Sequence, residues 1–211
     1  MEHVDEKILK QREMMEEFEK QRFDKDNIEK ENQSSIFDGQ IEIHKIPVSF
    51  AERSLLDDRI AIWMPEDFRE LTQEEINAVY LLGNKPDVVY GNAYLNLSLG
   101  FHYTDNEVPN EYMGDFVKIA RMILEKSGPK VTVYSEKVRK TGYHTVSSLE
   151  LVSHTITDTI YNVMFYSSLN GKVLIGFLNF NYRYLDRYKK IAKEMLESFR
   201  FIEDSRKEEE G

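Results

Sequence analysis

Histidine is the side chain of this sequence best suited to acid–base or metal chemistry, because its charge changes near neutral pH. The chain has five, at His3, His44, His102, His144 and His154. No two have the i, i+4 spacing that puts a pair of metal ligands on one helix face, and there is no cysteine to complete a site. His102 and Asp105 could meet at a strand end, but a hydrogen-bonded surface histidine is the simpler interpretation. We predict that the protein binds neither a metal nor a cofactor.

Hydroxyl groups gather on two adjoining predicted strands, at Ser147, Ser148, Ser153, Thr155 and Thr157. A nucleophilic serine needs a base and an orienting group within hydrogen-bond distance, and His144 or His154 would be the nearest base in the sequence. Nothing in the spacing requires that arrangement, so we interpret the hydroxyls as polar residues on a solvated strand face. The sequence also lacks a glycine-rich phosphate loop and the HExxH and GxSxG motifs. We predict that the protein is not an enzyme.

Aromatic residues are the best candidates for a binding surface. The chain contains twelve tyrosines, most of them in or beside predicted strands, where tyrosine is simply a good strand former. Tyr182, Arg183 and Tyr184 differ because they lie in a predicted loop, where exposure favours contact with a partner. The single tryptophan, Trp63, is expected in the core or as a lid over the sheet edge. These four residues are our predicted partner-binding residues.

The segment 157–202 organises the elements that would position these residues. Asn170 and Gly171 favour a tight type I′ hairpin between two apolar strands. In the second strand the residues alternate between two apolar faces, with Val173, Ile175 and Phe177 on one and Leu174, Leu178 and Phe180 on the other. An amphipathic helix follows, with its apolar stripe at Tyr188, Ile191, Ala192, Met195, Leu196 and Phe199. The sequence thus predicts a sheet that is covered on both faces, one of them by this helix.

The preceding residues alternate between strand and helix patterns. We predict strands over 41–46 (ending at Pro47), 48–50, 59–64, 87–90, 93–103, 131–138 and 143–155. A capping box at Thr72 and Glu75 predicts a helix to about residue 82. After a loop through Asp105 and Asn106, Pro109 begins a second helix, with a buried stripe expected at Tyr112, Phe116, Ile119, Ala120, Ile123 and Leu124. Consecutive strands joined by short turns predict a largely antiparallel sheet.

Three regions of different composition divide the chain. Residues 1–40 form a polar helix, rich in Glu and Lys, followed by a linker over 32–40. We predict that residues 41–203 form the globular domain and that residues 204–211 form a charged, disordered tail. The polar helix has only a thin apolar stripe, so it is equally consistent with a mobile, a docked or a partner-binding segment.

Charge and composition narrow the class of partner. The 211 residues carry a formal net charge of -10 with 41% hydrophobic residues, which suits a folded protein and not one that binds nucleic acid or an anionic membrane. No run reaches the roughly 20 apolar residues that span a bilayer. The first residues also lack the apolar core of a signal peptide. We expect a cytoplasmic protein without membrane insertion.

The segment from Ile41 to Ile202 resembles PsbP-like and DcrB-like proteins, the group with the Mog/PsbP fold. The resemblance lies in an isoleucine-rich strand before the turn Trp63 to Phe68 and in the final strand, NGK turn, strand and helix that end at Ser198 to Phe201. The group includes the Ran-binding nuclear import factor Mog and bacterial effector chaperones. The resemblance implies an α/β/α sandwich that binds other proteins and generally lacks catalytic residues, but no site residue is carried over.

These observations predict one fold and two functions. We expect an α/β (α+β) protein, an α/β/α sandwich whose largely antiparallel sheet has about six to eight strands with helices on both faces. The first predicted function is a non-enzymatic protein-binding domain, such as a chaperone or adaptor for a secreted effector. The alternative is a small-molecule or lipid binding domain with a pocket between sheet and helix. A homodimer through an exposed strand edge is compatible with both.

Overall fold

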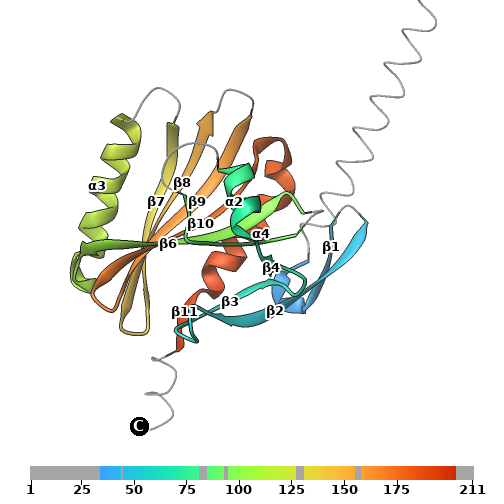
Figure 1. Cartoon of the computed structure of the whole chain (residues 1–211), viewed down its shortest axis with the longest axis horizontal. Helices are drawn as coiled ribbons and strands as arrows, with labels where there is room; N and C mark the ends of the chain where they lie inside the picture. The colour runs from blue at the N-terminus through green and yellow to red at the C-terminus, as the bar shows by residue number, and fades with distance from the viewer. Residues whose placement is uncertain are drawn as a thin grey trace, which may run out of the picture.

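The computed structural model describes residues 34–43, 45–80, 85–92, 95–126, 131–154 and 158–202 (Figure 1). The described strands are β1 (Gln40–Ile43), β2 (Ile46–Leu55), β3 (Ile60–Pro65), β4 (Arg69–Glu70), β5 (Val88–Gly91), β6 (Leu97–Glu107), β7 (Val131–Thr141), β8 (His144–His154), β9 (Thr159–Leu169), β10 (Lys172–Asn181) and β11 (Arg200–Phe201). The described helices are α2 (Gln73–Val79), α3 (Met113–Lys126) and α4 (Leu185–Ser198), with 3-10 turns η1 (Ile36–Asp38), η2 (Asn110–Tyr112) and η3 (Tyr182–Tyr184).

The described strands form two sheets, and every pairing between them is antiparallel. The large sheet has seven strands in the order β4-β5-β6-β10-β9-β8-β7, and the small sheet has four in the order β1-β2-β3-β11. The prediction of a largely antiparallel sheet with about six to eight strands is confirmed by the large sheet, but the second, four-stranded sheet was not predicted. The second sheet arises because β3 is buried along most of its length on both faces, and it forms a layer against the large sheet instead of extending it.

The central hairpin has the predicted geometry. Asn170 and Gly171 have φ angles of 53° and 81°, the left-handed values that a type I′ turn requires. The turn sets Lys172 opposite Leu169, and the two-residue alternation then follows along β10. Val173 and Ile175 join one apolar cluster, while Leu174, Leu178 and Phe180 join the other. The sequence prediction for both faces of β10 is confirmed.

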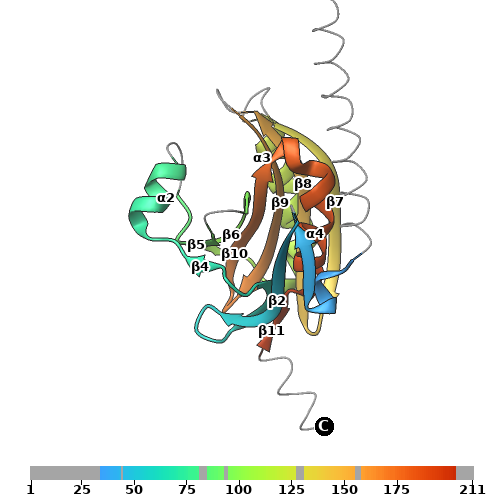
Figure 2. The same cartoon turned by 90° about the vertical axis from the view of Figure 1, so that its right-hand side faces the viewer.

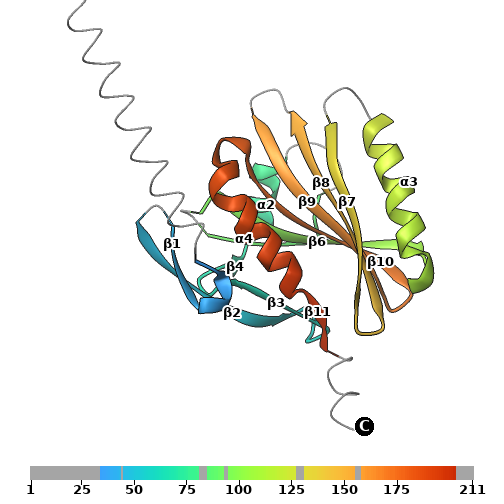
Figure 3. The same cartoon turned by 180° about the vertical axis from the view of Figure 1, so that it is seen from behind.

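Helices cover the two faces of the large sheet unequally. One face packs against α4 and the small sheet, which together with β8, β9 and β10 enclose the larger apolar cluster. Figure 3 shows α4 lying diagonally across this face with the small sheet beside it. The opposite face packs against α3 over β7, β8 and β9. In Figure 2, α2 and α4 lie on opposite sides of the large sheet. The predicted helices on both faces are present, but the small sheet shares one face with α4.

Two local predictions are corrected by the structure. Pro47 does not end a strand but lies near the start of β2, opposite Glu42 of β1. Proline is tolerated there because β3 pairs with β2 only from Phe50 onward. The predicted loop through Asp105 and Asn106 is the continuation of β6, since β6 still pairs with β10 at Glu107.

The helix α3 turns a different side to the sheet from the one predicted. Met113 and Val117 are its fully buried residues, whereas Tyr112, Ile119 and Ile123 are 57%, 51% and 60% exposed. The remaining predicted stripe residues, Phe116, Ala120 and Leu124, are half-buried against the same cluster. The apolar residues of this helix span a wider arc than the sheet covers, so the arc alone did not fix which edge faces inward.

The packed part of the chain starts before the predicted boundary at residue 41. Ile36, assigned to the linker, is fully buried, and its backbone N–H donates to Glu194 of α4 over 3.0 Å. Ser35 and Asp38 cap the 3-10 turn reciprocally. The capping box of α2 is confirmed as well, with both bonds between Thr72 and Glu75. The predicted N-terminal helix and the predicted disordered tail over 204–211 lie outside the described residues.

Candidate functional site

A cavity of about 310 Å³ lies between α4 and the β7–β8 side of the large sheet. We call it the α4 cleft. Its lining residues are Lys137, Val138, Arg139, Val146, Ser148, Glu150, Val163, Lys193, Leu196 and Glu197. Val146 and Val163 on the floor are each 1% exposed, so the cleft reaches down to the core. This is the position between sheet and helix at which the sequence predicted a ligand pocket.

Glu150 is the one buried charged residue in the part of the chain that the structure describes, at 8% exposed. Its carboxylate accepts a hydrogen bond from the Tyr161 hydroxyl over 2.5 Å and pairs with Lys193 over 2.9 Å and Lys189 over 3.7 Å. Burial by itself raises the pKa of Glu150, but the bonds from Tyr161 and Lys193 and the charge of Lys193 outweigh burial and lower the pKa. Glu150 is therefore ionised at neutral pH and holds two lysines at the cleft.

Arg139 of β7 forms the wall of the cleft near the C-terminal end of α4. Its guanidinium donates to the carbonyl oxygens of Leu196 and Phe199 over 2.7 and 2.9 Å and to the hydroxyl of Thr141. Both carbonyls lie at the C-terminus of α4, where the i+4 N–H groups of the helix are missing. The carbonyl of Leu196 also accepts the Phe199 N–H over 3.1 Å. Burial lowers the pKa of Arg139, although the charge of Glu197 opposes the shift. This arginine ties β7 to α4 and sets the width of the cleft.

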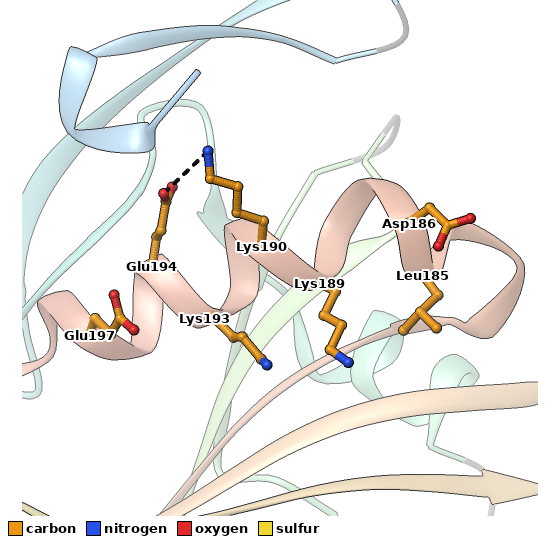
Figure 4. Close-up of a pocket in the computed structure, with 7 residues that line it drawn as sticks. All are labelled: Leu185, Asp186, Lys189, Lys190, Lys193, Glu194 and Glu197. Carbon is orange, nitrogen blue, oxygen red and sulfur yellow. Dashed lines mark ion pairs between the residues drawn. The ribbon is translucent and has the colours of Figure 1, made fainter. Parts of the chain in front are cut away.

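The outer side of α4 continues the cleft as a shallow hollow of about 560 Å³, lined by Leu185, Asp186, Lys189, Lys190, Lys193, Glu194 and Glu197. Figure 4 shows that Lys189 and Lys193 point the same way from the helix, as expected for an i, i+4 pair. Lys190 and Glu194 point the other way and pair over 3.6 Å. Two lysines of α4, Lys189 and Lys193, thus lie on the side of Glu150, and the third, Lys190, is directed with Glu194 at the segment around η1.

Tyrosines mark the end of the cleft nearest the start of α4. Burial and the neighbouring Glu150 raise the pKa of Tyr161, and the hydroxyls of Tyr134 and Tyr182 add to this effect. These two hydroxyls are therefore close enough to Tyr161 to interact with it electrostatically. Tyr134 is 62% exposed and Tyr182 is 39% exposed. The amine of Lys189 also lies 5.7 Å from the centre of the Tyr161 ring.

The predicted partner-binding residues do not form one surface. Tyr182 lies at the tyrosine end of the cleft, in a 3-10 turn and not in the predicted loop. The Arg183 guanidinium stacks over Tyr184 at 4.8 Å, and Tyr184 packs on the buried Tyr188. Trp63 is half-buried at the other end of α4, where its backbone N–H donates to the Ser198 hydroxyl over 2.8 Å. The helix between these ends is about 20 Å long by its rise per residue, so a single small partner would not contact both.

The histidines that the structure describes lie in three separate places. His102 pairs with Asp87 over 2.9 Å, while Asp105, its predicted neighbour, pairs with Lys172. His144 stacks on Phe201 with ring centres 3.6 Å apart, and His154 hydrogen bonds Thr159. Within residues 34–202, as far as they are described, no group of three His, Asp or Glu side chains could hold a metal ion. His3 and His44 lie outside the described residues.

The predicted hydroxyl cluster is split between environments. Ser147, expected on a solvated face, is fully buried and donates to the carbonyl of Met113 over 2.9 Å. Ser148 lines the α4 cleft, and Ser153 accepts a bond from Asn162. Thr155 and Thr157 lie outside the described residues. The two-residue period of β8 explains the split, because neighbouring serines point to opposite faces.

Two further hollows lie at the end of the molecule where the β9–β10 hairpin turns. They have volumes of about 380 and 370 Å³ and share Arg59, Leu169 and Asn170. Arg59 is already paired with Asp57 over 3.0 Å, and Lys172 with Asp105 over 2.8 Å. We favour the α4 cleft because it alone among these hollows contains a buried charge and reaches the edge of the large sheet.

The edge at the cleft is β7, which pairs with β8 on one side and has no strand on its other side among the described residues. It is eleven residues long and carries an irregularity between Val133 and Ser135. Lys137 and Arg139 project from it into the cleft. An unpaired edge next to a cavity offers backbone hydrogen-bonding groups together with a side-chain pocket.

Two central residues of the α4 cleft, Glu150 and Arg139, were not predicted from the sequence. The signal for Glu150 was a lone acidic residue inside the otherwise uncharged strand over 144–154, since a charge there needs partners. Arg139 had no comparable signal, because it lies in a run of exposed charged residues of β7. Only the position of α4 distinguishes it from Lys137 and Lys140.

Comparison with known proteins supports the fold. No protein-family model matches the sequence, and no curated protein matches it. The solution structure of PsbP from the cyanobacterium Synechocystis sp. PCC 6803 (CyanoP) is similar, with a TM-score of 0.52 at 13% identity, over 73% of this chain and 93% of that one. The chain therefore has the PsbP-like fold that the sequence predicted.

Two other solved structures resemble the chain more weakly. A protein of unknown function from Pseudomonas aeruginosa, PA94, gives a TM-score of 0.42 at 10% identity, over 71% of this chain and 94% of that one. LpqN of Mycobacterium tuberculosis, described as involved in cell envelope biogenesis, gives 0.45 at 11% identity, over 73% and 91%. In the described part of this chain, no helix is both long and apolar enough to cross a membrane.

Proposed function

We propose that this protein is a non-enzymatic binding domain that captures an extended segment of a partner protein along β7. One side chain of the segment would enter the α4 cleft. The observation that carries this proposal is the outer edge of β7, which no described strand pairs with, beside a cavity that reaches the core. A chaperone or adaptor role is compatible with such capture.

This mode of binding uses two kinds of contact. An added strand gains affinity from main-chain hydrogen bonds to an exposed edge, and pockets for its alternate side chains provide specificity. The volume of the α4 cleft, about 310 Å³, is at the lower end of the range for small-molecule pockets, about 300–1,000 Å³. A cavity of this size suits one large side chain better than a whole lipid.

The chemistry of the cleft supports binding over catalysis. A general base that works near neutral pH needs a pKa close to that pH. The pKa of Glu150 is lowered instead, because Tyr161 and Lys193 stabilise its ionised form. Its carboxylate is thus a poor proton acceptor and a good anchor for the lysines.

A small anionic molecule is the second candidate ligand. It is favoured by the enclosed position of the cleft between sheet and helix and by Lys137 and Lys193 on its two sides. A small molecule would need only the cleft, whereas a protein segment would also need the edge of β7. Protection of the β7 amides from hydrogen exchange upon binding would therefore distinguish the two ligands.

A peptide-display selection tests the proposal directly, because a random library supplies candidate segments of many sequences. Random peptides displayed on phage are selected against the immobilised full-length protein, and the enriched peptides are synthesised and titrated. The variant Ser148→Phe fills the cleft from its floor, so we expect affinity for these peptides to fall about tenfold or more, as for a blocked central pocket.

The matched control is Ser54→Phe, which adds the same aromatic ring to an exposed position of β2 in the small sheet. This variant should bind the peptides like the parent protein, and thermal unfolding should show that both variants are folded. Equal affinity of Ser148→Phe and the parent would show that the cleft is not the binding site. Enrichment of no peptide at all would refute capture of extended segments.

A further inference from the structure

We propose that the α4 cleft selects an acidic side chain, so that the partner is a segment with an aspartate or glutamate among strand-forming residues. This inference rests on the proposed function and names the chemistry that the pocket would accept. The cleft presents charged groups from two walls, β7 and α4, and its floor is apolar apart from Ser148 and Glu150.

Cations outnumber carboxylates around the cleft. Lys137 and Arg139 of β7 and Lys193 of α4 line it, whereas the acidic groups that line it are Glu150 and Glu197. The whole chain has a formal net charge of -10, so this local excess of positive charge is opposite in sign to the rest of the protein. A cleft of one sign attracts ligands of the other, since its low-dielectric walls concentrate the field.

Lys137 is the cation most available to a ligand. It is exposed on β7 and lines the cleft, and it forms no ion pair with any residue that the structure describes. Lys193 faces it from α4 and uses one contact, to Glu150 at 2.9 Å. An ammonium group has three donors, so Lys193 retains donors for a second carboxylate. A ligand carboxylate between these two lysines would complete the ion pairs of the cleft.

Glu150 would repel a second carboxylate if it faced the ligand directly. Its oxygens are instead engaged by Tyr161 and Lys193, with Lys189 nearby. The residue is 8% exposed, whereas the side chains of its partners Lys189 and Lys193 are 43% and 35% exposed. Glu150 therefore orients Lys193 for the ligand, whereas a cationic side chain entering the cleft would meet Lys137 and Lys193 first.

The peptide selection is repeated with a charge-reversed cleft to test this inference. We expect peptides selected on the full-length parent to contain Asp or Glu at one preferred position, flanked by strand-forming residues. The variant Lys137→Glu should bind these peptides about tenfold more weakly, and Lys137→Gln about fivefold more weakly, near the upper limit for a partly exposed ion pair. A new selection on Lys137→Glu should enrich Lys or Arg at that position.

Lys140→Glu is the matched control, because Lys140 lies on the same strand but alternates to the opposite face and does not line the cleft. It should leave both affinity and the selected sequences unchanged. Peptides that need the cleft but show no acidic preference would overturn this inference and leave the proposed function standing. Peptides whose affinity responds equally to Lys137→Glu and Lys140→Glu would also overturn it, since only the overall charge would then matter.

Discussion

Gly176, at the centre of β10, gives the sharpest test of how this fold is packed. It lies opposite Phe165 of β9 on one side and Phe101 of β6 on the other. A Cβ atom at Gly176 would lie 2.1 Å from Cζ of Phe165, whereas carbon atoms in contact prefer about 3.5–4.0 Å. The substitution Gly176→Ala therefore requires the Phe165 ring to move away from β10.

The ring has little freedom to move. Phe165 is 1% exposed, and the rings of Phe101 and Phe199 lie 6.0 and 5.1 Å from it, centre to centre. Overpacking a core of this kind costs about 1–3 kcal/mol, and we place this site at the upper end because the ring is confined on several sides. Alanine in a strand recovers about 0.5–1 kcal/mol relative to glycine. The expected net loss is about 2 kcal/mol, or about 4–8 °C in Tm for a chain of this length.

Urea unfolding followed by far-UV circular dichroism measures this loss, and Gly91→Ala provides the control. Gly91 is also a strand glycine, but the nearest atoms to its added Cβ are 3.9 Å away, so its stability should be equal to or slightly above that of the parent. Adding Phe165→Leu to Gly176→Ala should recover part of the loss by making room for the methyl group. If Gly176→Ala were as stable as Gly91→Ala, the close approach of Phe165 to β10 would be wrong.

Two further predictions concern the α4 cleft. Arg139→Met should keep the packing of the side chain but remove the guanidinium from both carbonyls, which leaves that of Leu196 with only the Phe199 N–H. The expected cost is about 2 kcal/mol in the urea-unfolding free energy. A loss below about 0.5 kcal/mol would show that solvent replaces the guanidinium. The pKa of Glu150 is lowered in the folded state, so its contribution is complete above the unfolded pKa of about 4.3 and is lost as pH falls below it. Stability measured from pH 6 to pH 3 should therefore fall less in Glu150→Gln than in the parent, and parallel curves would refute the ionised pairing.

Features set by neighbouring residues were predictable from the sequence. The hairpin at Asn170 and Gly171 needs two left-handed residues, and the two faces of β10 follow from strict alternation. The capping box at Thr72 and the stripe of α4 are equally local. In each case the residues that decide the structure lie within one or two turns of the chain, so their spacing carries the information.

Features set by contacts between distant segments were not predictable in the same way. The small sheet is completed by β11, where Phe201 pairs with Ile60, and a two-residue strand has no sequence pattern of its own. The α4 cleft joins residues of β7, β8 and α4 whose separate patterns are those of ordinary strands and an ordinary helix. The predicted residue Tyr182 reaches this site only at its margin, because its loop position indicated exposure but not which element it would face.

The charges on β7 connect the free edge to the proposed selectivity. An exposed strand edge invites pairing with any other strand, and proteins limit this with lysines and with irregularities in the strand. β7 has both, with Lys137, Arg139 and Lys140 near its end and the irregularity after Val133. The strand carries these three cations against one acidic residue, Glu136, so two copies paired through this edge would bring together strands of the same net charge. A partner segment with an acidic residue meets no such repulsion, so the same charges that disfavour self-association through β7 would favour the partner proposed here.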